Sequence, residues 1–465
     1  MAVYIYDTLE RRKKPLEDKT VRIYVCGPTV YDHTHMGHAR VYVTFDAFRR
    51  FLMELGYNVR LIVNITDVED KIIRRSQEEG VSRKEIAERY YNEFVEVLDK
   101  LGIIKPDAFP HASEHIEEMI EIISGLIDKG YAYVAEDGVY YHVPKFKEYG
   151  KLSKQSLDAI IAGKRIEPSP YKKHPADFAL RKRHKPGEPK RDSPRMPGRP
   201  GRHIECSAMS MKYLGETLDI HGGGADLIFP HHENEIAQSE AYTGKRFVKI
   251  RMHVGLVQVK GEKMAKSLGN YFLVLEALKR RSKDAIRLYY LSHHYRSPIE
   301  FSPEALDEAE KLVERIREAY AKAKSVYKKY TAKRLDEEDM RYIEELERLR
   351  DEFREALSDD FNTAEALKRV LEAISVFNKY FSRPEPKHSV AYRLMRLLEE
   401  FSRIYGIDLE RVSSEEEKLI ELILEVREEL RKRKLYDLSD KIREKLREMG
   451  IIVADSKKGP IRRKI

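Results

Sequence analysis

The sequence of 465 residues predicts an α/β fold, a Rossmann-like parallel-sheet domain with a connective insertion, followed by an α-helical bundle and a small basic C-terminal domain. Three observations predict it. Apolar and amphipathic segments alternate in the first hundred residues, apolar residues recur at helical spacing after residue 302, and basic residues are concentrated near the C-terminus. A chain of this length exceeds what one hydrophobic core usually serves, so several domains are expected.

The first part of the chain predicts alternating strands and helices. We expect a strand at 21–25, a helix at 39–55, a strand at 59–65, and helices at 82–100 and 116–129. The helix at 82–100 begins with a serine followed three residues later by a glutamate, which is typical of a capping box. This alternation predicts the opening of a parallel sheet.

The middle of the chain is less regular. Residues 131–134 and 139–143 predict a small hairpin, and residues 167–202, rich in Pro, Gly, Lys and Arg, predict a surface loop or insertion. Regular structure is expected again from residue 203, and a helix is expected to begin near Pro230.

The last part of the chain predicts helices. Leucine, isoleucine and valine recur at three- and four-residue spacing in segments 305–327, 336–357, 363–381 and 391–404. Residues 427–465 contain 14 lysines and arginines against 7 acidic residues. This excess predicts a polyanionic partner for the C-terminal end, although a solvated basic helix would give the same pattern.

The composition indicates the cellular location of the protein and the state of its two cysteines. The sequence has no apolar run long enough to span a membrane and no apolar signal core at its N-terminus, so we expect a cytoplasmic protein without a membrane partner. Cys26 and Cys206 are far apart in the sequence, and each is expected to be either a core thiol or a metal ligand.

Residues 26–38 carry the most informative motif. This segment follows the first predicted strand and leads into the first predicted helix, whose N-terminus offers free N–H groups to a phosphate. His35 and His38 are three residues apart, so both rings can face one ligand, and Gly37 lets that ligand approach the backbone. The motif predicts nucleotide chemistry.

A second motif lies at residues 263–267. Lys263 and Lys266, in a loop flanked by Gly261 and Gly269, are suited to hold a departing pyrophosphate. Either motif alone is weak evidence, because a Lys-x-x-Lys loop is usually plain surface and the histidine pair could be a packed helix start. The two motifs together, in this order, are specific.

The two motifs resemble the signature motifs of the class I aminoacyl-tRNA synthetases, and nearly the whole chain is similar to the cysteinyl-tRNA synthetase family. The similar segments are 24–46, 64–73, 203–208, 219–238, 262–271, 294–297 and 359–367. The resemblance implies a ligase that activates L-cysteine with ATP and Mg²⁺ to cysteinyl-adenylate, then transfers cysteine to the 3′ end of the cysteine tRNA. It implies as catalytic residues His35, His38, Lys263 and Lys266.

The resemblance also implies one zinc ion. The family binds zinc through two cysteines, a histidine and a glutamate, which match Cys26, Cys206, His231 and Glu235. The histidine and glutamate are four residues apart, a spacing that brings two ligands together on a helix, whereas His232 would point about 100° away. Zinc deprotonates a thiol but not an alcohol, so the family's metal is expected to select cysteine over serine.

Further roles follow from the resemblance position by position. The residues matching the cysteine pocket are Gly27, Thr29, Thr66, Arg202 and His221. Those matching the ATP site are Gly37, Gly223, Gly224, Asp226 and Lys266. The aspartate is placed to accept a hydrogen bond from the ribose. His221 could equally be a structural histidine of the turn.

The expected organisation has six parts. They are the first half of the catalytic domain (1–130), the connective insertion (131–200), the second half of the catalytic domain (201–255), the signature-lysine loop and stem-contact region (256–315), the tRNA-binding helical bundle (316–410) and a basic anticodon-recognition unit (411–465). We expect the protein to act as a monomer.

The sequence departs from the family pattern at its tryptophans. It contains none, and arginine stands at four positions where the family has tryptophan, namely Arg181, Arg191, Arg195 and Arg202. The last of these replaces an aromatic wall of the cysteine pocket, so a guanidinium would meet the substrate there.

Three alternatives remain open. A cysteine ligase of thiol biosynthesis would join cysteine to an amino sugar with similar chemistry, but it would lack a tRNA-binding C-terminal part. A methionyl-type synthetase is disfavoured because it holds zinc in a cysteine-rich knuckle. A catalytically impaired RNA-binding paralogue would be expected to lose a signature histidine or lysine, and none is lost.

Overall fold

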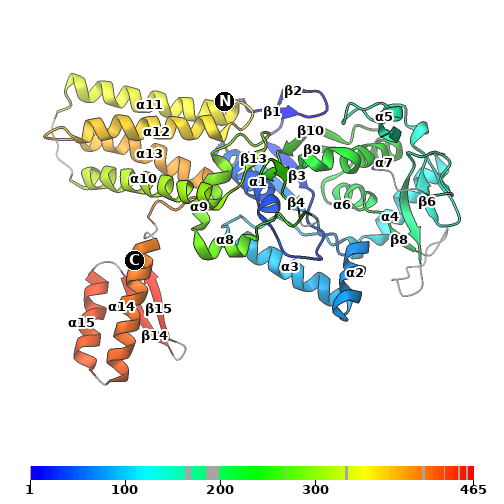
Figure 1. Ribbon diagram of the computed structural model, residues 1–465. Coiled ribbons are helices and arrows are strands. Elements are labelled where there is room, and N and C mark those ends of the chain that lie inside the picture. The colour runs from blue at the N-terminus through cyan, green and yellow to red at the C-terminus, as the bar shows by residue number, and fades with distance from the viewer. Residues whose placement is uncertain are drawn as a thin grey trace. The chain divides into compact units, whose positions relative to one another are not determined.

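The computed structural model describes residues 2–162, 169–184, 198–265, 268–329, 334–410, 414–433, 435–448, 451–456 and 459–464. They form two compact units, Met1–Leu409 and Glu410–Ile465. Figure 1 shows the order of the elements along the chain. None of the described helices is long and apolar enough to cross a membrane.

A four-stranded parallel sheet lies at the centre of the first unit, which confirms the predicted α/β fold. Its strands are β3 (Thr20–Val25), β4 (Asn58–Val63), β9 (Leu218–Gly224) and β10 (Val248–Val254), in the order β10-β9-β3-β4. The strand order reverses between β3 and β9, which pair side by side although the insertion separates them in sequence. Ligands of such sheets bind at this reversal, beyond the carboxyl ends of the strands.

Helices flank this sheet. They are α1 (Met36–Glu54), α2 (Asp70–Glu79), α3 (Arg83–Lys100), α4 (Ile116–Asp128), α6 (Ile204–Leu214) and α7 (Glu233–Thr243). The predicted helices are confirmed, and Ser82 caps α3 by accepting a hydrogen bond from the Glu85 N–H at 3.1 Å. The sequence did not predict α2, because only Ile72 of that helix is buried and the apolar period is therefore missing.

The insertion forms an antiparallel sheet of four strands. The strands are β5 (Ala132–Val134), β6 (Gly138–Tyr141), β7 (Phe178–Arg183) and β8 (Gly198–Pro200), and α5 (Leu157–Ala162) lies between β6 and β7 in the chain. The hairpin is confirmed, and of the two interpretations of residues 167–202, surface loop or insertion, the structure supports the insertion, because β7 and β8 lie there. Its β7 strand buries Arg181 beside Leu180, and a buried arginine hides the apolar alternation that predicts a strand.

Small elements join the sheet to the helical part. They are β1 (Tyr4–Asp7), β2 (Arg12–Pro15), β11 (Val257–Val259), β12 (Glu262–Lys263), β13 (Ile299–Glu300), α8 (Val274–Arg280) and α9 (Lys283–Leu291). The bundle follows as α10 (Pro303–Lys328), α11 (Glu337–Ser358), α12 (Thr363–Phe381) and α13 (His388–Tyr405), which lie side by side in Figure 1. The four predicted helices are confirmed, since each presents an apolar stripe to the others.

The second unit is small. It contains α14 (Ser414–Lys432), α15 (Tyr436–Glu448) and the antiparallel strands β14 (Ile451–Ser456) and β15 (Gly459–Lys464). Leu446 and Val453 are buried together, with Ile423, Leu424 and Ile442 packed against them. Such a small apolar cluster gives a unit of modest stability.

A buried ion pair ties the bundle to the sheet domain. Arg287 of α9 and Asp46 of α1 are both fully buried, and the Arg287 Nη2 lies 2.5 Å from the Asp46 Oδ2. The same guanidinium donates hydrogen bonds to the carbonyl oxygens of Tyr405 and Leu101, at 2.6 and 3.2 Å. Arg50 also contacts Asp46, at 2.8 Å.

Replacing Arg287 by methionine is expected to lower the free energy of unfolding by about 2 kcal/mol, because the Asp46 carboxylate and two carbonyl groups lose a buried partner while Arg50 still contacts the carboxylate. Chemical denaturation of the two proteins measures the difference. The double variant Asp46→Leu/Arg287→Met should lose less than the sum of the single variants. Additive losses would show that the pair is not coupled.

Candidate active site and metal centre

The candidate site lies where β3 and β9 end. The Cys26 N–H donates to the Gly222 carbonyl at 3.0 Å, which joins the first residue beyond β3 to β9. A side chain at Gly27 would meet the Asn64 carbonyl oxygen at 1.5 Å, so only glycine fits the next position. A cavity of about 410 Å³ opens here. The expected site residues that line it are Cys26, Gly27, Thr29, His35, Gly37, His38, Arg202, Gly224, Asp226 and Lys263.

The histidine pair lies at the start of α1. The rings of His35 and His38 are stacked, with centroids 3.7 Å apart and planes inclined by 22°. A side chain at Gly37 would come within 2.9 Å of the His35 ring, so glycine leaves the pair room beside the backbone. The first turn of the helix carries no acidic side chain, and its partial positive charge is therefore available to an anion.

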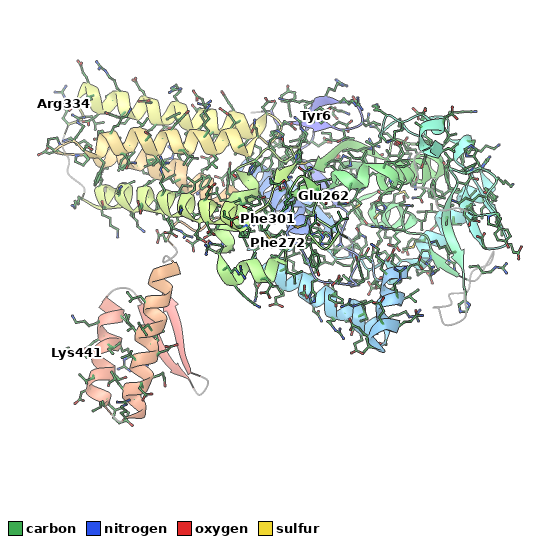
Figure 2. The ribbon with its side chains drawn as sticks, viewed as in Figure 1. Tyr6, Glu262, Phe272, Phe301, Arg334 and Lys441 are labelled. Atoms are coloured by element: carbon green, nitrogen blue, oxygen red, sulfur yellow. The ribbon has the colours of Figure 1, made fainter. Side chains whose placement is uncertain are left out.

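The histidine motif and the lysine loop are physically joined. The Met36 N–H donates to the Phe272 carbonyl at 2.9 Å, and the Val274 N–H donates to the Thr34 carbonyl at 3.1 Å. Phe272 in turn packs against Phe301, with ring centroids 4.8 Å apart (Figure 2). The end of the lysine loop is thus anchored to the start of α1, which brings the two sequence motifs to one cavity.

The first signature lysine, Lys263, forms an ion pair with Asp226. The Lys263 amine lies 2.7 Å from the Asp226 carboxylate, and both side chains are partly exposed. The sequence did not predict this ion pair, because each residue was expected to face ATP. Lys266 lies outside the described residues.

The four expected metal ligands meet in one buried cluster. The sulfur atoms of Cys26 and Cys206 are 3.9 Å apart, and the Cys206 Sγ lies 3.5 Å from the His231 Nε2. The Glu235 Oε1 is 2.9 Å from the His231 Nε2 and 3.8 Å from the Cys26 Sγ. Two thiolates bound to one tetrahedral zinc would be about 3.8 Å apart, given Zn–S bonds of about 2.3 Å. The donor separations therefore fit such an ion.

His232 is also part of this cluster, and the expectation that it points away is wrong. Its Nε2 lies 3.2 Å from the Cys26 Sγ, and a second set of mutually close donor atoms comprises Cys26, His221, His232 and Glu235. The expected direction of His232 assumed that a regular helix begins at Pro230. The regular helix α7 begins only at Glu233, and Phe229 has extended backbone angles of −136° and 133°.

The protonation of the cluster is set by burial and mutual contacts. Burial and the neighbouring Cys206 raise the pKa of the Cys26 thiol, whereas the hydrogen bond from Cys26 lowers the pKa of Cys206 to about 6. Burial opposes charge on Glu235, but His221 and His231 outweigh it and hold the pKa of the carboxyl well below its usual range. The cluster thus readily supplies a thiolate and a carboxylate, the ionised forms that a metal requires.

Hydrogen bonds around the cluster orient the ligands. The Nδ1 of His231 lies 2.7 Å from the Nδ1 of His203, and the Nδ1 of His232 lies 2.8 Å from the Nε2 of His253. Residues of this outer layer fix ring orientation at metal sites. The sequence analysis set His232 aside and missed His203 and His253. The adjacent histidines at 231 and 232 were a signal for the first, whereas no local pattern marks the other two.

Six expected site residues that the structure describes do not line the cavity: the metal ligands Cys206, His231 and Glu235, and also Thr66, His221 and Gly223. Thr66 donates its hydroxyl to the Glu205 carboxylate at 2.9 Å, and His221 binds the Glu235 Oε2 at 2.7 Å with its Nε2. A side chain at Gly223 would meet Leu227 at 2.8 Å. The structure places the last three residues behind the wall of the cavity, where they support it.

The arginines that replace tryptophans fall into two groups. Arg202 is exposed and lines the cavity, while Arg181 is buried, donates to the Gly198 carbonyl at 3.1 Å, and has its pKa lowered by burial. Arg191 and Arg195 lie outside the described residues.

Comparison with known proteins identifies the family. Residues 12–311 match the tRNA synthetases class I (C) catalytic domain, and residues 352–410 match the DALR domain. The chain is 48% identical to the cysteine–tRNA ligase of Thermococcus gammatolerans and 49% identical to that of Pyrococcus horikoshii, with both chains covered completely in each case.

A solved structure supports the fold. A methionyl-tRNA synthetase of Mycobacterium tuberculosis bound by methionyl-adenylate superposes with a TM-score of 0.65 at 14% identity, covering 83% of this chain and 92% of that one. Matches over the whole length to cysteine–tRNA ligases, together with the class I catalytic domain, show that this chain belongs to the cysteinyl-tRNA synthetase family of class I aminoacyl-tRNA synthetases.

Proposed function

We propose that this chain charges the cysteine tRNA by way of cysteinyl-adenylate, with the residues of the cavity in the roles that follow. One observation carries the proposal. The thiol-containing cluster and the histidine–lysine nucleotide motif adjoin a single cavity, and Cys26 belongs to both. The amino-acid and nucleotide sites are therefore close enough for a carboxylate to reach an α-phosphate.

The cluster of Cys26, Cys206, His231 and Glu235 is the proposed zinc site. It contains both thiols of the chain, and soft thiolates favour zinc over magnesium or calcium. The second donor set contains only one thiol, so we favour the first. A bound zinc ion would have to take the substrate thiolate as a fifth ligand beside these four, a position that serine cannot occupy as an anion.

Other residues of the cavity position cysteine. Gly27 and Thr29 follow β3 and form the wall beside Cys26, and Arg202 presents a guanidinium that can pair with the substrate carboxylate. Thr66 and His221 act from behind this wall, through Glu205 and Glu235 respectively. The family uses an aromatic surface at position 202, so this chain would hold the substrate by charge instead.

Adenylate formation then requires an in-line attack. A carboxylate oxygen of cysteine bonds to the α-phosphorus of ATP, and the bond to the departing pyrophosphate breaks. His35 and His38 stabilise charge on the phosphates, and Lys263 and Lys266 follow the pyrophosphate, with Mg²⁺ accompanying ATP. Gly224 and Asp226 hold adenosine, so Lys263 must leave Asp226 when ATP binds.

The second reaction transfers cysteine to the tRNA. A hydroxyl of the terminal ribose attacks the carbonyl carbon of the adenylate, and AMP leaves. We propose that the bundle and the basic unit after residue 410 hold the tRNA, because the net positive charge of the chain is concentrated in residues 427–465. A cysteine ligase specific for an amino sugar would have no use for this charge.

Removing the metal tests this function. Cysteine-dependent exchange of pyrophosphate into ATP is expected to fall at least about tenfold after chelation, and to return with added zinc, because the substrate thiolate loses its ligand. Serine should support at most about one hundredth of the exchange that cysteine supports, a ratio that a site discriminating by polar contacts reaches.

Two outcomes would contradict the proposal. Exchange with serine equal to that with cysteine would show that no thiolate is selected. Elemental analysis verifies that the protein is free of metal. If exchange with cysteine persists in that protein, the cluster has only a structural role.

A further inference from the structure

Lys71 is a cation of the cavity that the preceding roles do not use. It lies in the first turn of α2 and lines the cavity together with His35, His38, Arg202 and Lys263. Its amine stands 5.0 Å from the centre of the Tyr31 ring, which is also part of the cavity wall. The side chain is therefore directed to the space where the reaction is proposed to occur.

No carboxylate of the described residues forms an ion pair with the Lys71 amine. The two acidic residues that precede it have other partners: Asp70 pairs with Lys182 at 3.4 Å and with Arg199, and Glu69 caps α2 by accepting the Lys71 backbone N–H at 2.9 Å. Burial lowers the pKa of the Lys71 amine, and the charges of Arg202, Arg74 and Lys263 lower it further while Glu69 raises it, so Lys71, Arg202 and Lys263 act on one another across one space. An anion bound among them would relieve that repulsion.

A second cavity adjoins the first. It has a volume of about 570 Å³, and Arg202 lines both. Glu69 and Asp70, which precede Lys71, belong to its wall. The start of α2 and Arg202 thus separate the two cavities.

The lining of the second cavity suits a single-stranded nucleic-acid end. Its aromatic side chains are Tyr140, Tyr149, Phe178 and Phe229, and its cationic ones, Lys172, Lys182, Arg183, Arg199 and Arg202, share the wall with the carboxylates of Glu69, Asp70, Asp137 and Asp177. Aromatic rings that stack on bases, combined with cations for phosphates, are the usual elements of such sites. Asp70 pairs with Lys182 at 3.4 Å and with Arg199, which holds these cations close to the start of α2.

We propose that Lys71 binds a backbone phosphate of the tRNA acceptor end, whose terminal nucleotides pass from the second cavity, beside Arg202, to the cysteinyl-adenylate. This inference rests on the proposed function. The phosphates of ATP share the same chemistry, but His35, His38 and Lys263 are already assigned to them. Lys71 is therefore expected to act in the transfer of cysteine rather than in its activation.

The test compares the two half-reactions in the zinc-loaded, full-length enzyme. Lys71→Met keeps an unbranched, flexible side chain that is one atom shorter, and removes the amine with its charge and its contact with the Tyr31 ring. Single-turnover transfer from preformed cysteinyl-adenylate to a cysteine tRNA transcript is expected to fall about tenfold to a hundredfold, since one charge-assisted contact is lost. The fold decrease in pyrophosphate exchange, measured without tRNA, should be at least about ten times smaller than the fold decrease in transfer, because adenylate formation precedes this contact.

Two further variants make the result specific. Lys71→Arg keeps the charge and is expected to restore most of the transfer rate. Lys100→Met removes an exposed lysine of α3 that pairs, among the residues the structure describes, with Glu96 at 2.9 Å, and should leave both half-reactions within about twofold.

Several outcomes would overturn the proposal. Equal losses in exchange and transfer would show that Lys71 binds a phosphate of ATP, and unchanged rates in Lys71→Met would show that it binds no anion. A loss that Lys71→Arg does not restore would point to packing against Tyr31. Absence of cysteine-dependent exchange in the wild-type enzyme would contradict the proposed function, and this inference with it.

Discussion

Replacing Cys206 by serine is expected to lower cysteine-dependent pyrophosphate exchange at least about a hundredfold, because loss of a direct metal ligand exceeds the tenfold to hundredfold cost of losing an outer-layer contact. The Cys206 sulfur is fully buried, 3.9 Å from the Cys26 sulfur and 3.5 Å from His231. A hydroxyl at that position stays protonated and binds zinc poorly. Exchange assays give the rate, and elemental analysis of the purified variant gives its zinc content.

The effect should concern cysteine much more than ATP. Cys206 does not line the cavity, so the KM for ATP is expected to change less than about threefold, while the KM for cysteine rises or saturation is lost. The variant His232→Gln separates the two possible donor sets. If Cys206, and not His232, is a ligand, the serine variant loses zinc and the glutamine variant retains most of it.

The reverse result would contradict the assignment. Zinc retained in Cys206→Ser but lost in His232→Gln would select the set formed by Cys26, His221, His232 and Glu235. Zinc and activity both retained in Cys206→Ser would leave the cysteines as core thiols, which is how an isolated cysteine is usually interpreted.

The regular helices and strands could be predicted because apolar residues recur at the positions that face the core. The bundle helix Thr363–Phe381 has the bounds that its apolar period predicts. The strand of the insertion at Phe178–Arg183 could not be predicted, because an arginine occupies a buried position there, and α2 was missed because it buries little. Both exceptions adjoin the cavities, where residues are selected for chemistry rather than for packing.

The site was predictable where chemistry requires a fixed spacing along one segment. His35 and His38 stack at the start of α1, as their separation suggests, and the i, i+4 pair of His231 and Glu235 lies within 2.9 Å. Contacts between distant segments were not predictable. The ion pair of Lys263 with Asp226 depends on how β9 and the lysine loop meet in space, which no local pattern records.

His38 should have the largest effect among the nucleotide-binding residues. Its ring is stacked on His35 at 3.7 Å but is more exposed than that of His35, which is packed beside Gly37. His38→Asn is expected to lower pyrophosphate exchange about a hundredfold to a thousandfold, the usual cost of removing one donor that stabilises charge in a transition state. The loss should appear mainly in kcat, because ATP retains the glycine turn and the start of α1 in the ground state.

His33→Asn is the matched control. His33 lies two residues before His35, but its ring binds the Glu93 carboxylate at 2.5 Å and does not line the cavity. Exchange should stay within about threefold in this variant, the range of a surface ion-pair contact. If both variants unfold at a midpoint temperature near that of the wild type, a loss of fold is excluded as the cause. A decrease in exchange of less than tenfold in His38→Asn would show that His38 does not stabilise the transition state. His35 and the backbone N–H groups of α1 would then bind the phosphates.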